Sequence, residues 1–249
     1  MNKEEFNYDL PKYLIAQEPA KPKSASKLFI PDINKITFFN QLTNYLDCDN
    51  VVVFNNTKVI PAVIEGRKDD RIIKITLNTK NKRGYWTAFA KPAKKINKGD
   101  NIHFNNRISA KVHEKRKQEV IIKFNQTEKK LLSFLIKHGS LPLPPYIKSF
   151  ENKANLKKNY QTSFAKKLGS FACPTAGLHF DEKIFHDFKK KNINIINITL
   201  HVGAGTFFPL EHENISDNVL HKEMGIISKA AAEKITKSIN KGKKIVAVG

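Results

Sequence analysis

A chain of 249 residues with 40% hydrophobic residues can bury a substantial core, as one large domain or two smaller ones. The formal charge of +21 favours a polyanionic partner such as RNA, although lysines can also serve only to solvate the surface. Two cysteines without a C-x-x-C spacing exclude a disulfide framework, and the chain has neither an apolar signal region nor a membrane-length apolar run. We therefore expect a cytoplasmic protein without a membrane partner, and a monomer.

The first segment, residues 1–64, predicts one buried strand. Prolines 11, 19, 22 and 31 keep residues 11–31 extended or turning rather than α-helical. Val51–Phe54 is an unbroken apolar run, which is typical of a buried strand. The polar residues Asn55-Asn56-Thr57-Lys58 follow it directly, and their short side chains suit either a turn or a ligand site.

Residues 65–124 contain closely spaced short β-rich runs with no helix between them, a pattern that predicts a small β-barrel. The runs are Ile72–Leu77, Tyr85–Lys91, Asn101–Phe104, Ile108–His113 and Val120–Phe124. Arg67 and other basic residues of this region could face a phosphate backbone, or could equally form a solvated rim of the barrel.

The remaining chain predicts alternating helices and strands. A helix covers Thr127–His138, with Thr127 as its cap and Gly139 as its stop. The next helix starts at Asp181 and places Ile184, Phe185 and Phe188 on one face, and the strand Ile193–Leu200 follows. A helix from Ser228 to about Lys241 and a strand at Lys244–Val248 end the chain. This order predicts an α/β fold with a largely parallel sheet.

Two stretches combine glycine with histidine beside predicted element ends. In ITLHVGAGTFF, His201 ends a strand and Gly203 and Gly205 follow; in PTAGLHF, Gly177 and His179 precede a helix. Open α/β sheets bind small molecules at such strand ends. Neither stretch fits a dinucleotide fingerprint or a phosphate loop, and each histidine could equally be a core residue satisfied by backbone hydrogen bonds.

PTAGLHF and TLHVGAGTF resemble the S-adenosylmethionine:tRNA ribosyltransferase-isomerases of queuosine biosynthesis. Further matching stretches occur in the family's order: YDLPKYL (8–14), VVFNNTKVIP (52–61), LPLPPYI (141–147) and YQT (160–162). The resemblance implies a discontinuous, α/β/α sandwich-like catalytic domain, residues 1–64 and 150–249, with an inserted β-barrel domain at 65–149. It also implies transfer and isomerisation of the ribosyl group of S-adenosylmethionine onto 7-aminomethyl-7-deazaguanine at the tRNA wobble position.

The chemistry of that reaction suggests residue types. The sulfonium acidifies the neighbouring 5′ protons, so a near-neutral base such as histidine is useful, and the departing adenine needs a donor. The resemblance implies catalytic roles for His201, His179, His221 and Glu223, without saying which histidine is the base. It implies S-adenosylmethionine contacts for Gly203, Gly205, Thr206, Phe180, Thr175 and Gly177. It implies tRNA contacts for Asn55, Asn56, Thr57, Lys58, Arg67, Tyr160 and Gln161, and no metal.

The sequence also departs from the family pattern. Asn218 stands where a first histidine is expected before His221, and Leu220 replaces a methionine. The chain ends at Gly249 within a matching strand, which leads us to expect a C-terminally truncated member. Two alternatives stay open: an inactive RNA-binding remnant of the family, and an unrelated nucleotide-binding enzyme that uses His201 and the glycine turn.

Overall fold

The computed structural model describes residues 1–105, 107–116, 119–144, 146–147, 156, 158–207, 209–220 and 222–249. The chain divides into two compact units. The barrel unit comprises Met1–Asn7, Val59–Pro145 and Gly203–Lys222. The sheet unit comprises Tyr8–Lys58, Tyr146–Val202 and Glu223–Gly249. The predicted boundaries at 64/65 and 149/150, taken as limits of domains, stay a prediction.

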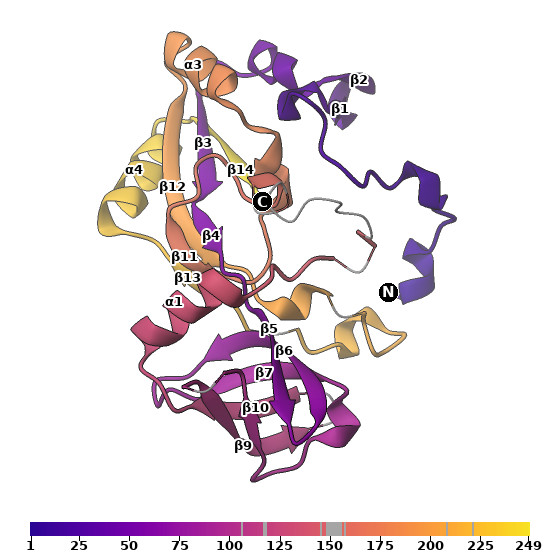
Figure 1. The fold of residues 1–249 in the computed structure, drawn as a ribbon. Helices are drawn as coiled ribbons and strands as arrows, with labels where there is room; N and C mark the ends of the chain where they lie inside the picture. The colour runs from indigo at the N-terminus through magenta and orange to yellow at the C-terminus, as the bar shows by residue number, and fades with distance from the viewer. Residues whose placement is uncertain are drawn as a thin grey trace. The chain divides into compact units, whose positions relative to one another are not determined.

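The sheet unit is built on a four-stranded sheet in the order β13-β12-β3-β14 (Figure 1). Its strands are β3 (Asn50–Asn55), β12 (Asn194–His201), β13 (Met224–Ile226) and β14 (Lys244–Val248). Strand β3 pairs in parallel with both β12 and β14, and β13 pairs antiparallel with the end of β12. The predicted strands at 51–54, 193–200 and 244–248 are confirmed, whereas β13 was not predicted.

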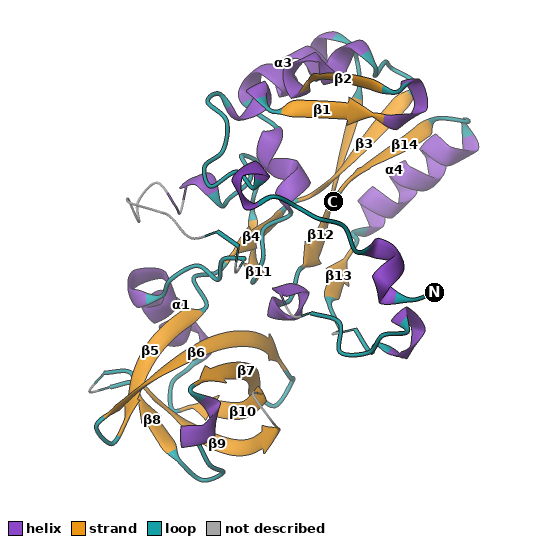
Figure 2. Cartoon of the chain, turned by 90° about the vertical axis from the view of Figure 1, so that its right-hand side faces the viewer, coloured by secondary structure: helices purple, strands orange, loops and turns teal. Residues whose placement is uncertain are grey.

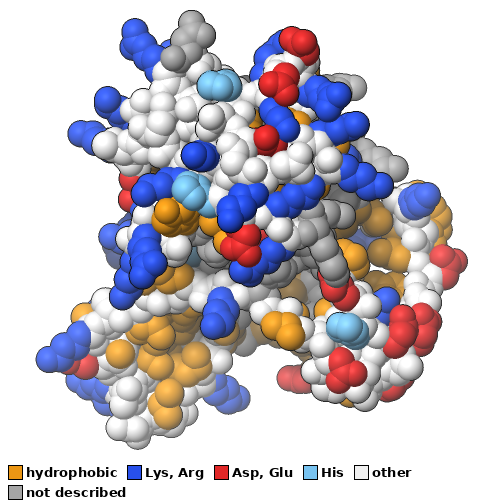
Figure 3. All heavy atoms as spheres, turned by 90° about the horizontal axis from the view of Figure 1, so that it is seen from below, with side chains coloured by type: hydrophobic (Ala, Val, Ile, Leu, Met, Phe, Trp, Pro, Cys, Tyr) orange, Lys and Arg blue, Asp and Glu red, His pale blue; other side chains and the backbone are white. Residues whose placement is uncertain are grey.

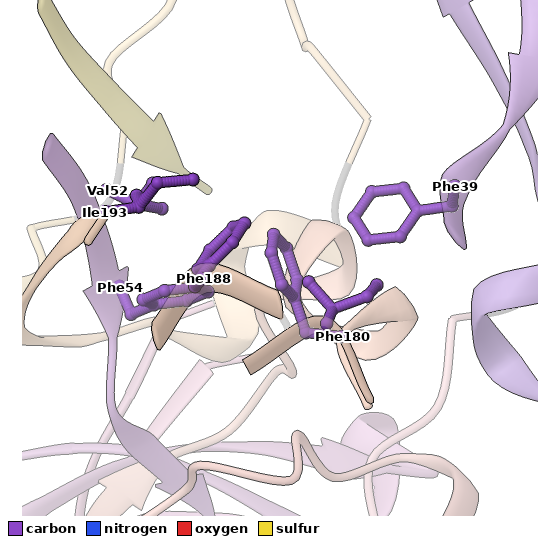
Figure 4. Close-up of a cluster of buried hydrophobic side chains, with 7 residues drawn as sticks. Phe39, Val52, Phe54, Phe180, Phe188 and Ile193 are labelled. Atoms are coloured by element: carbon purple, nitrogen blue, oxygen red, sulfur yellow. The ribbon is translucent and has the colours of Figure 1, made fainter. Parts of the chain in front are cut away.

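Each face of this sheet is covered by one helix, because alternate side chains of β3 point to opposite faces. Val52 and Phe54 pack against α3 (Glu182–Lys190), through Ile184 and Phe188 (Figure 4). Val51 and Val53 pack with Ala231 of α4 (Lys229–Asn240) on the other face, and Figure 2 shows α4 running beside β3 and β14. Since strands of a doubly covered sheet are buried on both sides, every residue of β3 is buried. The predicted α/β/α sandwich is confirmed.

Helix caps explain where these helices begin. The Asp181 carboxylate accepts a hydrogen bond from the Ile184 N–H at the start of α3, and the Ser228 hydroxyl accepts one from the Ala231 N–H at the start of α4. Helix α1 (Glu128–His138) confirms the third predicted helix. Thr127 and Gly139 occupy the N-cap and C-cap positions of α1, as predicted, although the Thr127 side chain makes no capping hydrogen bond.

The barrel unit contains a closed barrel in the order β10-β7-β6-β5-β8-β9, which confirms the predicted β-barrel. Its strands are β5 (Val63–Lys68), β6 (Arg71–Lys80), β7 (Trp86–Lys91), β8 (Asn101–His103), β9 (Ser109–Arg116) and β10 (Glu119–Phe124). Its interior is filled by Ile73, Ile75, Leu77, Ile102 and Ile122, which are all fully buried. Strand β5 was not predicted, since only Val63 and Ile64 begin it as an apolar run and its last four residues are Glu, Gly, Arg and Lys.

Several short elements also went unpredicted. Strands β1 (Lys27–Ile30) and β2 (Lys35–Phe38) form an antiparallel hairpin, and β4 (Thr57–Val59) pairs with β11 (Lys167–Ser170). Nine short 3₁₀ helices join the described elements: η1 (Lys3–Phe6), η2 (Lys12–Leu14), η3 (Lys23–Ala25), η4 (Pro31–Ile33), η5 (Phe39–Asn44), η6 (Ala93–Lys95), η7 (Thr175–His179), η8 (Ala204–Phe207) and η9 (Ile215–Asp217). Residues 11–31 form no α-helix, as the prolines predicted. Within the described ranges, no helix has both the length and the apolar character needed to cross a membrane.

Candidate functional site

His201 is the last residue of β12 and is half-buried. The side chain of Asn55 fixes the residue before it. The Asn55 amide donates to the Leu200 carbonyl and accepts from the Leu200 N–H, both at 2.9 Å. A side-chain amide that makes two hydrogen bonds to one backbone residue imitates a neighbouring strand. Asn55 is itself buried at the end of β3. Its two hydrogen bonds therefore fix the position of β12 relative to β3 at the residue before His201.

The residue after His201 is fixed by Ser170, at the end of β11. The Val202 N–H donates to the fully buried Ser170 hydroxyl at 2.9 Å, and the Phe171 N–H donates to the Val202 carbonyl at 2.8 Å. The hydroxyl of Ser170 also donates to the Ala172 carbonyl at 2.7 Å. The backbone on both sides of His201 is therefore held by hydrogen bonds to segments distant in the sequence.

Two further residues hold the His201 ring. The Thr57 hydroxyl lies 2.8 Å from His201 Nδ1. A Cβ atom placed on Gly169 would lie 2.4 Å from Cε1 and 2.6 Å from both ring nitrogens, so it would sit over the face of the imidazole. Only glycine fits at position 169 while the ring keeps this place. Burial lowers the pKa of His201 below its usual value, which favours the neutral ring.

His179 lies at the end of η7, within the PTAGLHF stretch, and is also half-buried. Its ring packs on Phe39 with centroids 5.2 Å apart. Burial lowers the pKa of His179, a hydrogen bond to the backbone of Lys23 opposes that effect, and the Lys23 ammonium adds to the lowering. His179 is therefore also a neutral imidazole at neutral pH. No described contact joins His179 to His201.

Lys23 links His179 to the segment before β11. Its ammonium donates to the carbonyls of Lys158, Asn159 and Gln161 at 3.3–3.4 Å, and burial lowers its pKa. Burial raises the pKa of the Cys173 thiol to about 12. The same cause raises the pKa of the Tyr160 phenol to about 12, so both groups stay neutral. Tyr160 is buried here, whereas Gln161 is half-buried.

The other predicted residues of PTAGLHF differ in exposure. Phe180 is a core residue, with ring centroids 4.8 Å from Phe39 and 4.7 Å from Phe54. Thr175 is exposed. A Cβ on Gly177 would lie 2.7 Å from Phe164 and 2.9 Å from Thr162, so this glycine permits close packing. The buried hydroxyl of Thr162 has no hydrogen-bond partner among the described residues, which is unusual for a buried polar group.

Gly203, Gly205 and Thr206 belong to the barrel unit, although they follow His201 closely in the chain. Gly205 and Thr206 lie in η8, which packs against β6. Gly203 is buried, and Thr206 is exposed. Arg67 is also exposed on the barrel unit, in β5.

Asn55 and Asn56 make hydrogen bonds within the protein that hold neighbouring segments in place. The Asn56 side-chain oxygen accepts a hydrogen bond from the Thr199 hydroxyl at 2.7 Å. The backbone carbonyl of Asn56 accepts from the N–H groups of Lys166 and Lys167. Lys58 is exposed. These bonds make Asn55 and Asn56 residues that position β12, whereas direct contacts of this stretch with tRNA stay a prediction.

The third part of the predicted site comprises His221 and Glu223, and Asn218 precedes them in the chain. Its amide donates to the carbonyls of His212 and Asn214 at 3.0 Å and accepts from the His212 N–H at 2.9 Å, which closes a compact loop in the barrel unit. Glu223 is exposed on the sheet unit, and His221 lies outside the described residues. Among the residues that the structure describes, no group of three or more His, Cys, Asp or Glu side chains is placed to hold a metal ion.

Comparison with known proteins identifies the family. The model of the queuosine biosynthesis protein family matches residues 3–249. This chain belongs to that family. Relatives named S-adenosylmethionine:tRNA ribosyltransferase-isomerase include those of Rickettsia bellii and Staphylococcus haemolyticus, each 37% identical over 100% of this chain and 74% of the relative. The relative from Cereibacter sphaeroides is 34% identical over the same shares. The queuosine biosynthesis family is therefore a family of enzymes, as the motifs predicted.

A crystal structure of the S-adenosylmethionine tRNA ribosyltransferase from Thermotoga maritima is 26% identical to this chain, with a TM-score of 0.41. The match covers 98% of this chain and 68% of that one.

Three residues around the two histidines were not predicted from the sequence: Lys23, Gly169 and Ser170. Each acts through a histidine or a strand end far away in the sequence. A single sequence carries no signal for such a partnership beyond the small side chains of Gly169 and Ser170 themselves.

Proposed function

We propose that this protein transfers and isomerises the ribosyl group of S-adenosylmethionine onto 7-aminomethyl-7-deazaguanine at the tRNA wobble position. The products would be epoxyqueuosine in the tRNA, adenine and methionine. The observation that carries the proposal is the set of contacts around His201. Asn55, Thr57, Gly169 and Ser170 fix the position of a neutral imidazole at the end of a strand. A neutral imidazole suits acid–base chemistry beside a sulfonium.

Charge supports a tRNA partner. The chain carries 44 Lys and Arg against 23 Asp and Glu, and Figure 3 shows many Lys and Arg side chains among hydrophobic and acidic ones on the face that it views. Contacts of such side chains with phosphates release counterions and make binding dependent on salt. We propose Lys58 and Arg67, both exposed, as phosphate contacts, and a cytoplasmic monomer without a resident metal as the working protein.

S-adenosylmethionine would bind beside the two histidines as a substrate. The unpartnered hydroxyl of Thr162, next to Gly177, is a polar group that a ligand could satisfy. Thr175, Gly177 and Phe180 of the sheet unit are proposed contacts of this substrate. Gly203, Gly205 and Thr206 are proposed as contacts from the family resemblance alone. Tyr160, Gln161, His221 and Glu223 likewise stay proposed site residues.

The test is release of adenine from S-adenosylmethionine by this 249-residue chain. The tRNA carries the aminomethyl-deazaguanine base at the wobble position, and the control tRNA carries guanine there. Release that requires the modified base supports the proposal. Tight tRNA binding without binding of S-adenosylmethionine, measured by calorimetric titration, would instead indicate an RNA-binding remnant.

A further inference from the structure

The outer surface of the barrel places two lysines directly opposite each other on neighbouring strands. Lys111 of β9 pairs with Lys123 of β10, and both side chains are exposed while their neighbours along each strand are buried. Opposite residues of an antiparallel pair have Cβ atoms about 5 Å apart, and like charges at such positions are destabilising. Among the described residues, neither of these two lysines forms an ion pair with a carboxylate. This lysine pair therefore holds two positive charges that the described chain does not neutralise.

Two other opposed lysines on the same barrel have different surroundings. Lys74 of β6 lies opposite Lys91 of β7, and both side chains are exposed. Glu65 of β5 lies opposite Lys74 on its other side, so a carboxylate offsets part of the repulsion there. Lys111 instead has Asn101 of β8 on its other side, and an amide carries no charge. The row of residues through Lys111 therefore lacks a carboxylate at the corresponding place.

The carboxylates close to this lysine pair in the sequence have basic partners of their own. The Glu114 carboxylate pairs with Arg116 at 2.6 Å, and Glu119 lies opposite Arg116 across the two strands. The Asp100 carboxylate pairs with Lys68 at 2.5 Å. These ion pairs engage the nearby negative charges, so the counter-charge that the lysine pair needs has to come from a bound anion.

An aromatic ring fixes the position of one of the two ammonium groups. Lys123 Nζ lies over the Tyr85 ring, 4.9 Å from its centroid, which is a favourable cation–π distance. The His113 ring meets the Tyr85 ring edge to face, with centroids 4.8 Å apart. His113 is the extra residue of a β-bulge between β9 and β10, and a bulge redirects a side chain. The Asn81 side chain and backbone also bind the Tyr85 backbone, at 3.0 and 2.9 Å. The ring that orients Lys123 is therefore itself held in place.

We propose that an RNA phosphate binds between Lys111 and Lys123 on the outer face of the barrel, with Tyr85 and His113 as positioning residues. Two long cationic side chains that start about 5 Å apart can reach one phosphate together, and the phosphate removes their repulsion. A basic surface beside aromatic rings is typical of nucleic-acid binding, and the formal charge of +21 suits a polyanion. That the RNA is the tRNA substrate rests on the proposed function. All four residues lie in the barrel unit, so the surface is built within one compact unit.

The first experiment compares two double variants of the full chain in the binding of that tRNA at several salt concentrations. Lys111→Gln with Lys123→Gln should weaken binding about tenfold at about 0.1 M salt, and should reduce the slope of log K against log salt by about 1. Lys74→Gln with Lys91→Gln removes the same charge from the same barrel and should change the affinity by less than about twofold. Equal losses in the two double variants would indicate an effect of net charge alone and would overturn the proposal.

Thermal unfolding of the same proteins tests the repulsion on which the proposal rests. Replacing both members of the lysine pair by Gln removes two like charges that lie opposite each other, so the melting temperature of the free protein should stay the same or rise. Weaker tRNA binding without a loss of stability is the expected combination. A lower melting temperature in this double variant would show that the lysines stabilise the free fold, and would overturn the proposal.

Tyr85 supplies a matched pair of variants for its positioning role. Tyr85→Phe keeps the ring under the Lys123 ammonium and should bind tRNA within about twofold of the parent. Tyr85→Leu removes the ring and should weaken binding about threefold. In the Lys123→Gln background, Tyr85→Leu should have no further effect, because the group that the ring positions is already absent. A full loss from Tyr85→Leu in that background would overturn the positioning role.

A competition experiment tests whether the partner is RNA rather than an acidic protein. Poly-glutamate carries negative charge without phosphate groups, and at an equal concentration of charges it should not displace the tRNA from the parent protein. Displacement of the tRNA by poly-glutamate would indicate an acidic protein as the partner and would overturn the proposal.

The outcomes also separate this proposal from the proposed function. Selective loss of tRNA affinity in the Lys111 and Lys123 double variant, in a chain that releases no adenine, would support the surface and overturn the function. In an active chain, the same variant should raise the KM for tRNA and leave kcat unchanged. Adenine release with an unchanged KM for tRNA would support the function and overturn the surface.

Discussion

His201 and His179 are both half-buried and neutral, but their surroundings control different properties of the ring. Around His201, hydrogen bonds at Leu200 and Val202 and the close approach of Gly169 fix where the ring lies and how it is turned. Around His179, the Phe39 ring and the Lys23 ammonium provide an apolar contact and a nearby charge. A change beside His201 should therefore alter geometry, whereas a change beside His179 should alter protonation.

The largest effect should come from Gly169→Ala. The added methyl group would overlap the imidazole, so the ring must move away from its present place. A displacement of about 1 Å of a reacting group can cost about 100-fold in rate, and we expect that loss in adenine release. Gly225→Ala is the control, because its Cβ would meet only the flexible end of Leu200 at 3.0 Å. Equal rates for the two variants would show that the position of His201 is unimportant.

The second-largest effect should be the loss of folding stability in Asn55→Ala. The substitution removes both hydrogen bonds to Leu200 and leaves its backbone groups without partners, at a cost of about 2–3 kcal/mol in the free energy of unfolding. Asn56→Ala removes the Thr199 bond and should cost about 1 kcal/mol. Urea unfolding curves measure both values. A smaller loss for Asn55 than for Asn56 would contradict the view that Asn55 fixes the end of β12.

Lys23→Met should change the dependence of activity on pH. The pKa of His179 is lowered by burial and by the Lys23 ammonium, so a reaction that needs the neutral ring stays active to below pH 6.5. Removing the ammonium raises that pKa, and the acidic limb of kcat/KM against pH should move upward. Lys27→Met, an exposed change on β1, is the control. An unmoved acidic limb in Lys23→Met would show that this histidine does not govern the rate.

The same linkage has a sign for stability. Because the folded pKa of His179 lies below its unfolded value of about 6.5, the unfolded chain binds more protons in acid. This contribution to stability is complete above pH 6.5 and is lost as the pH falls towards the folded pKa. Urea unfolding from pH 7 to pH 5 should show the loss in the parent and a smaller one in Lys23→Met.

The smallest effect should come from Ser228→Ala, because Ser228 caps α4 and makes none of the described contacts with either histidine. It removes the cap of α4, with an expected loss of about 1 kcal/mol and no change in the kinetics of adenine release. A fall in the rate of adenine release in Ser228→Ala would contradict the view that this cap supports only the fold.

The sequence alone determined the longer helices, three strands of the main sheet and the largely parallel character of that sheet. Apolar alternation and the capping residues Asp181 and Ser228 placed β12, α3 and α4, because these signals are local in the chain. Closely spaced β-rich runs predicted the barrel. The family followed from PTAGLHF and TLHVGAGTF, which are continuous stretches. Strand β5 was missed, since a strand closed by partners on both sides needs no strongly apolar composition.

Only the tertiary structure decided which groups surround the two histidines. Thr57 reaches His201 across 144 positions of the chain, and Gly169 does so from a strand that no sequence pattern indicated. Lys23 likewise reaches His179 from a proline-rich turn. Which nitrogen of a histidine carries the proton depends on the nearest donor or acceptor in space, and that neighbour is set by strand pairing rather than by residues adjacent in the sequence.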